Sequence, residues 1–217
     1  KTNIPKSAHI KAAPADVEIL KFLGISAVSL GNNHIFDFGT AGYWDTIETL
    51  NKAHISWFGA ERQNFIVNRN GDKVIFLGYC CYSTNPYGLR RKGALHGIEL
   101  FDPKQVQKDI ENARSNNALP VVCVHAGNEH IHFPSLDHID IARKIASKNN
   151  FVYCGHHPHV IQGIEEIYGS LIAYSLGNFC FDWDGKRNSI WNLGYMVKLN
   201  LGDNHSITSE IIPYRQC

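Results

Sequence analysis

The chain has 217 residues, and 44% of them are hydrophobic, which is enough for one sizeable core. Its 21 Lys and Arg residues nearly balance its 20 Asp and Glu residues. Because such a chain has no net field to attract nucleic acid or an anionic membrane surface, we expect neither as a partner. No apolar run reaches the ~18 residues of a membrane span, so we expect no membrane segment in this chain.

Helix and strand patterns alternate in the first part of the chain. Apolar spacing predicts a helix over residues 14–23 and a buried strand over residues 25–30. A second helix is expected to begin with Thr40 as its N-cap. An Asn-Gly pair between two apolar runs predicts a hairpin with strands over residues 65–68 and 73–79.

The later part of the chain continues this alternation and then changes character. Residues 83–98 are polar and contain several glycines, which predicts a long loop. The next expected elements are a helix over 103–116, a strand over 120–124, a helix capped by Ser135 and a strand over 151–154. The tail predicts strands without intervening helices, over 164–167, 171–175, 194–201 and 207–212. We therefore expect an α/β fold of one domain over residues 1–217, with a mixed sheet, flanking helices and an antiparallel edge.

Polar clusters follow three of the predicted strands. Asn33, His34 and Asp37 come after the first strand. His125 and Glu129 come after the strand over 120–124, and the motif "GHHPH" at 155–159 follows the strand over 151–154. In open α/β sheets, ligands bind outside the carboxyl ends of parallel strands. We therefore expect these three loops to converge on one crevice.

The residue types in these loops indicate metal chemistry. The chain has 12 histidines, and imidazole, amide and carboxylate groups suit Zn, Mn, Fe or Ni better than Ca. Asn33, His125, His157 and His159 are the candidate ligands. A lone histidine is more often a hydrogen-bonded surface or core residue, and that is our interpretation of four others, namely His9, His54, His96 and His205. Two interpretations of Glu129 stay open, a functional group and a solvated carboxylate, and three histidines stay undecided, namely His130, His132 and His138.

Backbone preferences inside the motif "GHHPH" distinguish its three histidines. Pro158 favours extended backbone at His157, so His157 and His159 are predicted to project toward the same side. His156 is then expected to turn away and to act at most by supporting a ligand.

The six cysteines indicate a reducing compartment. Five of them lie in or beside apolar strand-like runs, and none forms a CxxC pair. Such residues usually behave as small buried apolar side chains and not as disulfide partners. This usage favours a cytoplasmic location. The even number of cysteines leaves disulfides open.

Three segments of the chain resemble the CapA-type proteins of poly-γ-glutamate capsule synthesis, a branch of the calcineurin-like metallophosphoesterases. They are "VSLGNNHIFDFGTAGYWDTIETL" (28–50), "VVCVHAGNEH" (121–130) and "GHHPHVIQGIEEIYGSLIAYSLGNF" (155–179). The resemblance implies a layered sandwich fold and divalent transition metals, two in a complete site.

The same resemblance implies roles for individual residues. Asn33, His125 and the pair formed by His157 and His159 match metal ligands, with the extra His156 as the competing first ligand of that pair. His34 matches the histidine that protonates a leaving group. Glu129 belongs to the capsule version of the motif as a metal or substrate ligand. Asp37 is placed to orient His34.

The chain departs from the family pattern at its beginning. The early Asp-x-His and Gly-Asp-x-x-Asp motifs, which supply the other half of a two-metal site, do not occur in it. Either the first strand and its aspartates precede Lys1, or the binuclear centre is incomplete, and we favour the first. The resemblance also implies a cell-envelope location through an N-terminal anchor upstream of Lys1, in conflict with the cysteine usage.

Two functions follow as expectations. The first is a metal-dependent hydrolase or transferase that acts on a phosphoester or γ-glutamyl-type substrate. The alternative is a noncatalytic module with a degenerate metal site that binds polyglutamate or helps to assemble the synthase. The expected partners are an anionic small molecule or polyglutamate and, in addition, proteins of the capsule synthase.

Overall fold

The computed structural model describes residues 8–84, 97–181, 190–201 and 207–216. The chain divides into two compact units, one of residues 1–65 with 77–101 and the other of residues 66–76 with 102–217. We call them the first and the second unit. The expected single domain over 1–217 is not tested by this division and stays a prediction. Most of the loop predicted over 83–98 lies outside the described residues.

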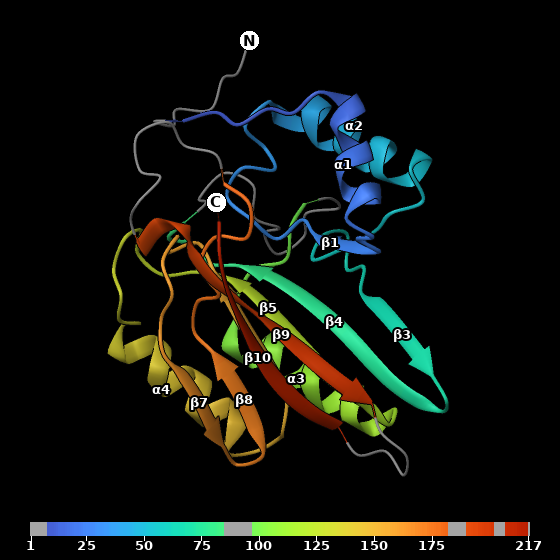
Figure 1. Cartoon of the computed structure of the whole chain (residues 1–217). Coiled ribbons are helices and arrows are strands. Elements are labelled where there is room, and N and C mark those ends of the chain that lie inside the picture. The colour runs from blue at the N-terminus through green and yellow to red at the C-terminus, as the bar shows by residue number, and fades with distance from the viewer. Residues whose placement is uncertain (1–7, 85–96, 182–189, 202–206, 217) are drawn as a thin grey trace. The chain divides into compact units, whose positions relative to one another are not determined.

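The first unit packs two short helical segments and one long helix around a small parallel sheet (Figure 1). Its elements are η1 Pro14–Asp16, α1 Val17–Phe22, β1 Ala27–Ser29, α2 Gly39–Lys52 and β2 Ser56–Phe58. Strands β1 and β2 pair in parallel. On α2, Tyr43, Ile47 and Leu50 are buried at the helical spacing that the sequence predicts.

The predicted N-cap of α2 is wrong. The helix begins at Gly39 with Phe38 as its N-cap, and Thr40 lies inside the first turn. The reason is a preceding turn, in which the N–H of Gly39 donates to the carbonyl of Phe36 at 2.8 Å and leads the chain directly into the helix.

A six-stranded mixed sheet forms the centre of the second unit. The elements from residue 65 onward are β3 Phe65–Arg69, β4 Asp72–Cys80, α3 Pro103–Ser115, β5 Ala118–His125, α4 Leu136–Ala146, β6 Val152–His156, β7 Ile164–Ile167, β8 Ser170–Ala173, η2 Ile190–Asn192, β9 Leu193–Leu201 and β10 Ile207–Arg215. The strand order is β3-β4-β5-β6-β8-β7, with β5, β6 and β8 parallel and β7 antiparallel to β8. Strands β9 and β10 form a separate antiparallel hairpin. The predicted α/β class with a mixed sheet is confirmed.

Within the second unit, the two faces of the sheet have different covers. Figure 1 shows the β9–β10 hairpin over one face and α3 and α4 behind the other. Val121 of β5 and Val152 of β6 belong to the cluster against which Val197 of the hairpin packs. Because side chains alternate along a strand, the odd-numbered residues of β5 and the even-numbered residues of β6 face the hairpin.

Local signals explain why several elements begin where they do. Asn70 and Gly71 have φ values of 52° and 90°, the left-handed backbone that the predicted Asn-Gly hairpin turn requires. Ser135 caps α4 by accepting a hydrogen bond from the N–H of His138 at 3.3 Å, as predicted. None of the helices in the described ranges has the length and apolar character needed to cross a membrane.

The central cysteines lie on the hairpin side of the sheet. Cys123 of β5 and Cys154 of β6 are partners in the strand register and pack against the same hydrophobic cluster. Burial raises the pKa of both thiols, to about 12 for Cys154. These two thiols are therefore poor nucleophiles and act as apolar packing groups.

Candidate functional site

The loop after β1 is held in a tight turn by its own side chains. The Oδ1 atom of Asn32 accepts the backbone N–H groups of His34 at 2.9 Å and of Ile35 at 3.0 Å. A Cβ atom on Gly31 would lie 3.1 Å from the backbone nitrogen of Tyr79, so this position favours glycine. The sequence therefore fixes the loop locally and directs the side chains that follow.

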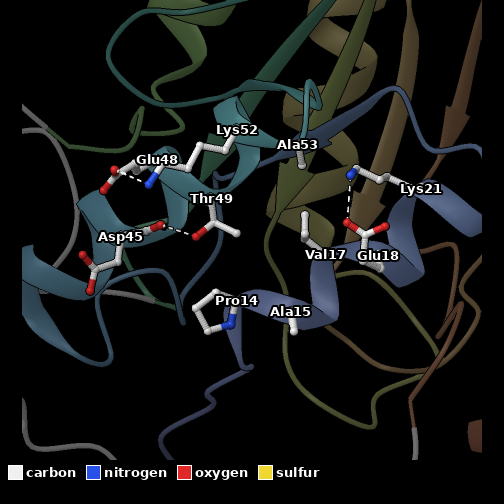
Figure 2. Close-up of a pocket in the computed structure, with 10 residues that line it drawn as sticks. All are labelled: Pro14, Ala15, Val17, Glu18, Lys21, Asp45, Glu48, Thr49, Lys52 and Ala53. Atoms are coloured by element: carbon white, nitrogen blue, oxygen red, sulfur yellow. Dashed lines mark hydrogen bonds and ion pairs between the residues drawn. The ribbon is translucent and has the colours of Figure 1, made fainter.

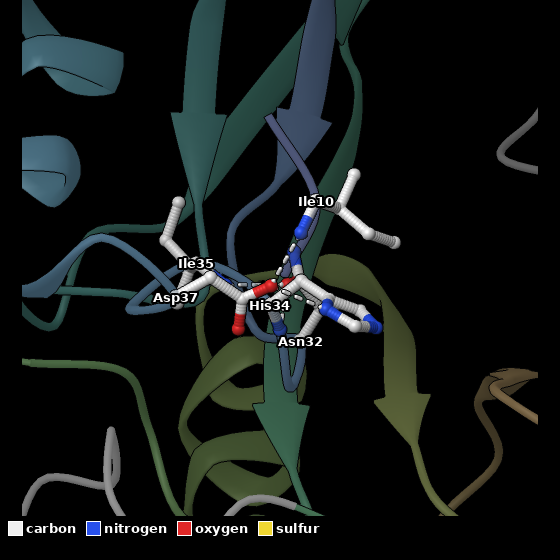
Figure 3. Close-up of polar contacts among 5 residues, drawn as sticks. All are labelled: Ile10, Asn32, His34, Ile35 and Asp37. Carbon is white, nitrogen blue, oxygen red and sulfur yellow. Dashed lines mark hydrogen bonds and ion pairs between the residues drawn. The ribbon is translucent and has the colours of Figure 1, made fainter. Parts of the chain in front are cut away.

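His34 and Asp37 form the central contact of this loop (Figure 3). The Nδ1 atom of His34 lies 2.7 Å from Oδ2 of Asp37, and the same oxygen accepts the N–H of Ile10 at 2.8 Å. Asp37 is 1% exposed. Because an ionised carboxylate can only accept, Nδ1 of His34 is the donor in this contact, and Nε2 is on the opposite side of the ring. Asn33, also buried, lies in the same loop.

The second unit brings three predicted residues together. Glu129, His157 and His159 each offer a ligand atom, and these atoms all lie within 4.8 Å of one another. A carboxylate and two imidazoles are a donor set that Zn, Mn and Fe accept, so these residues fit one divalent transition metal. Glu129 is exposed, and the two histidines are half-buried.

His125 lies beside this group without belonging to it. The ring of His125, at the end of β5, is 4.6 Å from that of His157 and 4.8 Å from that of His156. Its predicted role as a metal ligand stays a prediction. So does its predicted convergence with Asn33, because Asn33 belongs to the first unit and His125 to the second.

The orientation predicted for His156 is wrong. Strand β6 continues through His156 instead of ending at Cys154, and His156 is the register partner of His125. Because side chains alternate along a strand, this places His156 on the same face as Cys154, beside His125. His156 therefore lies inside the histidine cluster.

The backbone predicted for His157 is also wrong. The φ of His157 is 109°, so this residue lacks the extended backbone that Pro158 favours at the residue before it. The φ of His159 is 59°, which is also positive. The chain must reverse immediately after β6, and left-handed backbone at these two residues makes the reversal. The ligand atoms of His157 and His159 nevertheless lie within 4.8 Å of each other.

Backbone hydrogen bonds tie the two ligand-bearing loops together. The N–H of Ala126 donates to the carbonyl of His156 at 3.0 Å, and that of His130 donates to the carbonyl of Pro158 at 2.8 Å. His130 itself has a φ of 64°. Non-glycine residues in left-handed backbone concentrate where the surrounding structure holds them for a function. Glu129 is thereby held next to the histidine motif.

Asn178 is a residue of this cluster that sequence reasoning did not single out. Its Oδ1 atom lies 2.8 Å from Nδ1 of His159, and it is buried. Trp191 stacks on the ring of His159 with centroids 4.9 Å apart. Asn178 lies within the quoted segment 155–179, but no local pattern indicates that it contacts a side chain 19 residues earlier.

His138, undecided from the sequence, belongs to a different network. It lies on α4, and its Nε2 atom contacts the hydroxyl of Tyr153 on β6. Burial lowers the pKa of His138. It packs between helix and sheet, on the face opposite the β9–β10 hairpin.

A groove of about 520 Å³ lies between η1–α1 and α2 in the first unit (Figure 2). Its charges are largely compensated, because Lys21 pairs with Glu18 at 2.8 Å and Lys52 pairs with Glu48 at 2.6 Å. No residue that the sequence predicts for the site lines this groove. Within the first unit, it is therefore separate from the loop after β1.

Comparison with known proteins places the chain in a family. The model of the bacterial capsule synthesis protein PGA_cap matches residues 1–183. The chain belongs to this family. It is 29% identical over 218 residues to the capsule biosynthesis protein CapA of Bacillus anthracis, covering 96% of this chain and 52% of that protein. The PGA biosynthesis protein CapA of Bacillus subtilis is also 29% identical, with 96% of this chain and 55% of that protein covered.

A more distant relative is the "Probable polyglutamine synthesis accessory protein" of Mycobacterium tuberculosis. It is 23% identical over 222 residues, which cover 93% of this chain and 58% of that protein. The chain thus spans between half and three fifths of the length of these relatives.

Solved structures show the same fold. A 5'-nucleotidase precursor of Thermus thermophilus is similar with a TM-score of 0.59 at 15% identity, over 93% of this chain and 41% of that one. The NAD nucleotidase of Haemophilus influenzae is similar with a TM-score of 0.58 at 15% identity, over 93% and 42% of the two chains. The predicted metallophosphoesterase-like sandwich is confirmed as the fold, and at this identity nothing more is carried over.

Proposed function

We propose that this chain is a metal-dependent hydrolase or transferase of poly-γ-glutamate capsule synthesis, acting on a phosphoester or γ-glutamyl-type substrate. The observation that carries the proposal is the grouping of Glu129, His157 and His159 at the carboxyl ends of β5 and β6. Family membership and the CapA names of two relatives support the biological setting. Proteins of the capsule synthase are the proposed partners.

The metal requirement follows from the chemistry of these ligands. Glu129, His157 and His159 would hold one divalent ion, and His125, whose ring lies 4.6 Å from that of His157, is proposed as a further ligand. A bound divalent ion lowers the pKa of its water toward neutrality and neutralises charge on the group transferred. The identity of the ion is proposed only as Mn, Zn, Fe or Ni, because an imidazole and carboxylate set accepts each of them.

The residues of the first unit would supply the proton. Asp37 holds Nδ1 of His34 as a donor, so Nε2 of His34 carries the proton to a leaving oxygen or nitrogen and takes it back afterwards. The second bond to Asp37, from the N–H of Ile10, keeps the carboxylate in place. This arrangement supports Asp37 as a positioning residue and His34 as the general acid.

The experiment combines metal analysis with activity on a generic phosphodiester. We expect purified protein to retain a transition metal and to hydrolyse the ester, and we expect His34→Ala to lose activity while it keeps the metal. His54→Ala is the matched control, because His54 is exposed and lies in the first unit outside the strand-end loops. Protein without bound metal, or full activity in His34→Ala, would contradict the proposal.

A second function is a noncatalytic module that binds polyglutamate or assembles the synthase. The name of the Mycobacterium tuberculosis relative, which describes an accessory protein, favours it. This noncatalytic function predicts that a polyglutamate probe binds equally well before and after removal of metal by a chelator. The proposed enzyme predicts that chelation weakens binding of the same probe.

A further inference from the structure

The side-chain amide of Asn178 has one possible orientation. Its Nδ2 atom donates to the carbonyl of His159 at 3.2 Å and to the carbonyl of Trp191 at 3.0 Å. Carbonyl oxygens only accept hydrogen bonds, so the NH2 group must face them. The Oδ1 atom then faces Nδ1 of His159 at 2.8 Å and must act as the acceptor.

This orientation determines the tautomer of His159. An acceptor at Nδ1 requires the proton there, so the neutral ring carries its lone pair on Nε2. A metal binds the ring nitrogen with the lone pair, and the partner of the opposite nitrogen commonly sets ring orientation in metal sites. Asn178 thus prepares His159 to bind a metal through Nε2.

Aromatic packing fixes the plane of the same ring. Trp191 stacks on His159 with an interplanar angle of 19°, and Phe181 meets its edge with centroids 5.1 Å apart. Trp191 is 5% exposed, so its contact with His159 is part of the packed interior. Hydrogen bonding sets the tautomer of His159, and packing sets its direction.

The β9–β10 hairpin holds Asn178 in place. The hydroxyl of Tyr214 on β10 donates to the backbone carbonyl of Asn178 at 2.7 Å. Gly177 and Gly194 form an antiparallel bridge, and a Cβ atom on Gly194 would lie 2.8 Å from the carbonyl oxygen of Asn178 and would collide with the Tyr214 hydroxyl. The backbone of the hairpin therefore approaches Asn178 as closely as glycine allows.

We infer that Asn178 is a positioning residue for the metal ligand His159, and that the C-terminal hairpin is part of the site because it holds Asn178. The inference rests on the proposed function for the metal, but the tautomer it assigns exists without one. It also extends the site beyond the family match, since Trp191 and Tyr214 lie outside residues 1–183.

The experiment measures the ring nitrogens of His159 directly. Long-range ¹H–¹⁵N spectra of the metal-free whole chain, recorded at a pH where imidazole is neutral, distinguish the two tautomers. We expect the Nδ1–H form in the wild type. Asn178→Leu has no acceptor, and we expect the Nε2–H form to appear and zinc affinity to fall ~10-fold to 100-fold. Asn178→Asp keeps an oxygen acceptor, and we expect it to retain the Nδ1–H form.

Ser175→Ala is the matched control for a structural effect. Ser175 is buried in the same segment, and its hydroxyl donates to the carbonyl of Val160 at 2.8 Å. We expect this variant to lose stability but to keep the tautomer and the zinc affinity. Tyr214→Phe should shift the tautomer in the direction of Asn178→Leu, and it provides the test if the leucine variant does not fold.

The two possible failures are distinguishable. If Asn178→Leu, or Tyr214→Phe in its place, leaves both the tautomer and the zinc affinity of the wild type unchanged, the inference about Asn178 is wrong. An Nε2–H form in the wild type would also overturn it. If the wild type has the Nδ1–H form but binds no zinc, manganese, iron or nickel, the proposed function fails and the assignment of Asn178 to the tautomer stands.

Discussion

The Oδ2 atom of Asp37 accepts two hydrogen bonds, one from Nδ1 of His34 at 2.7 Å and one from the backbone N–H of Ile10 at 2.8 Å. The carboxylate is buried, and the imidazole is partly exposed. A buried carboxylate that holds Nδ1 of a partly exposed histidine fixes the direction of its ring, and the proposed proton transfer uses the opposite nitrogen. The chemistry proposed for the first unit depends on this pair.

Replacement of His34 or Asp37 should reduce turnover without removing metal. We expect His34→Ala to lower kcat on a generic phosphodiester by ~10² to 10⁴-fold, the usual contribution of a general acid. Asp37→Asn should lower kcat less, because the histidine stays but loses its ionised acceptor. Steady-state kinetics with metal analysis checks both. Asp45→Asn, which changes an exposed carboxylate on α2, is the control. Loss of metal together with activity in the His34 or Asp37 variant would contradict the roles assigned.

Glu129 should be required for metal affinity although it is exposed. Its ligand atom lies within 4.8 Å of those of His157 and His159. Loss of a group that only hydrogen-bonds a metal ligand costs ~10-fold to 100-fold in metal affinity. We expect Glu129→Gln to weaken zinc binding by at least this much. Competition titration with a chelating dye measures this change. Glu166→Gln, an exposed carboxylate on β7 with the same change of charge, should bind zinc as the wild type does. Equal affinities in the two variants would exclude Glu129 as a ligand.

Local sequence signals predicted much of the fold. The Asn-Gly turn, the Ser135 cap and the buried face of α2 depend on interactions within a few residues, and the structure has all three. Strand β2, over Ser56–Phe58, went unpredicted because three residues are too short for a period of two to be visible. The predicted N-cap of α2, Thr40, lies two residues after the observed N-cap, Phe38. Helix ends usually vary by one or two residues.

The sequence indicated candidate residues for the site, but it did not indicate their geometry. Strand-end position and residue type led to Glu129, His157 and His159, which the structure brings together. The face of His156 was wrong because β6 runs two residues further than its apolar run, and each added residue alternates the face. Asn178 could not be found from local sequence, because its contact with His159 is created by the packing of a separate segment.

Gly155, the first residue of "GHHPH", should tolerate no side chain. A Cβ atom there would collide with the backbone carbonyl oxygen of Tyr174 and lie 3.2 Å from the ring of Tyr153. Neither backbone nor a packed ring can move away easily, so we expect Gly155→Ala to lower the free energy of unfolding by ~1 to 3 kcal/mol or more. Chemical denaturation measures this.

Gly163→Ala is the control for the glycine effect, because nothing lies within 4 Å of the Cβ position at Gly163. It should change the free energy of unfolding by less than ~0.5 kcal/mol. Equal stability of the two alanine variants would show that the approach of Tyr174 to Gly155 is not as close as described.

His138 should make stability depend on pH in the mildly acidic range. Burial lowers its pKa below the ordinary value of 6.5. As the pH falls below that value, the unfolded chain takes up a proton at this residue before the folded chain does, so the free energy of unfolding decreases. Tyr153 and Tyr174 face this imidazole, and Glu165 accepts a hydrogen bond from Tyr174.

His138→Gln should flatten this dependence, because glutamine does not titrate. Denaturation at several pH values between 5 and 8, the range in which histidine titrates, measures the slope. His54→Gln removes an exposed histidine and should leave the slope as in the wild type. A wild-type slope in His138→Gln would show that another group is responsible.

The most direct test of the metal centre is anomalous diffraction from crystals of the whole chain grown with Zn²⁺ or Mn²⁺. We predict a peak within ~2.0 to 2.2 Å of a carboxylate oxygen of Glu129 and of one ring nitrogen each of His157 and His159. The nitrogen of His159 should be Nε2, with Nδ1 still bonded to Asn178. The absence of anomalous density at these three residues at saturating metal would contradict the account.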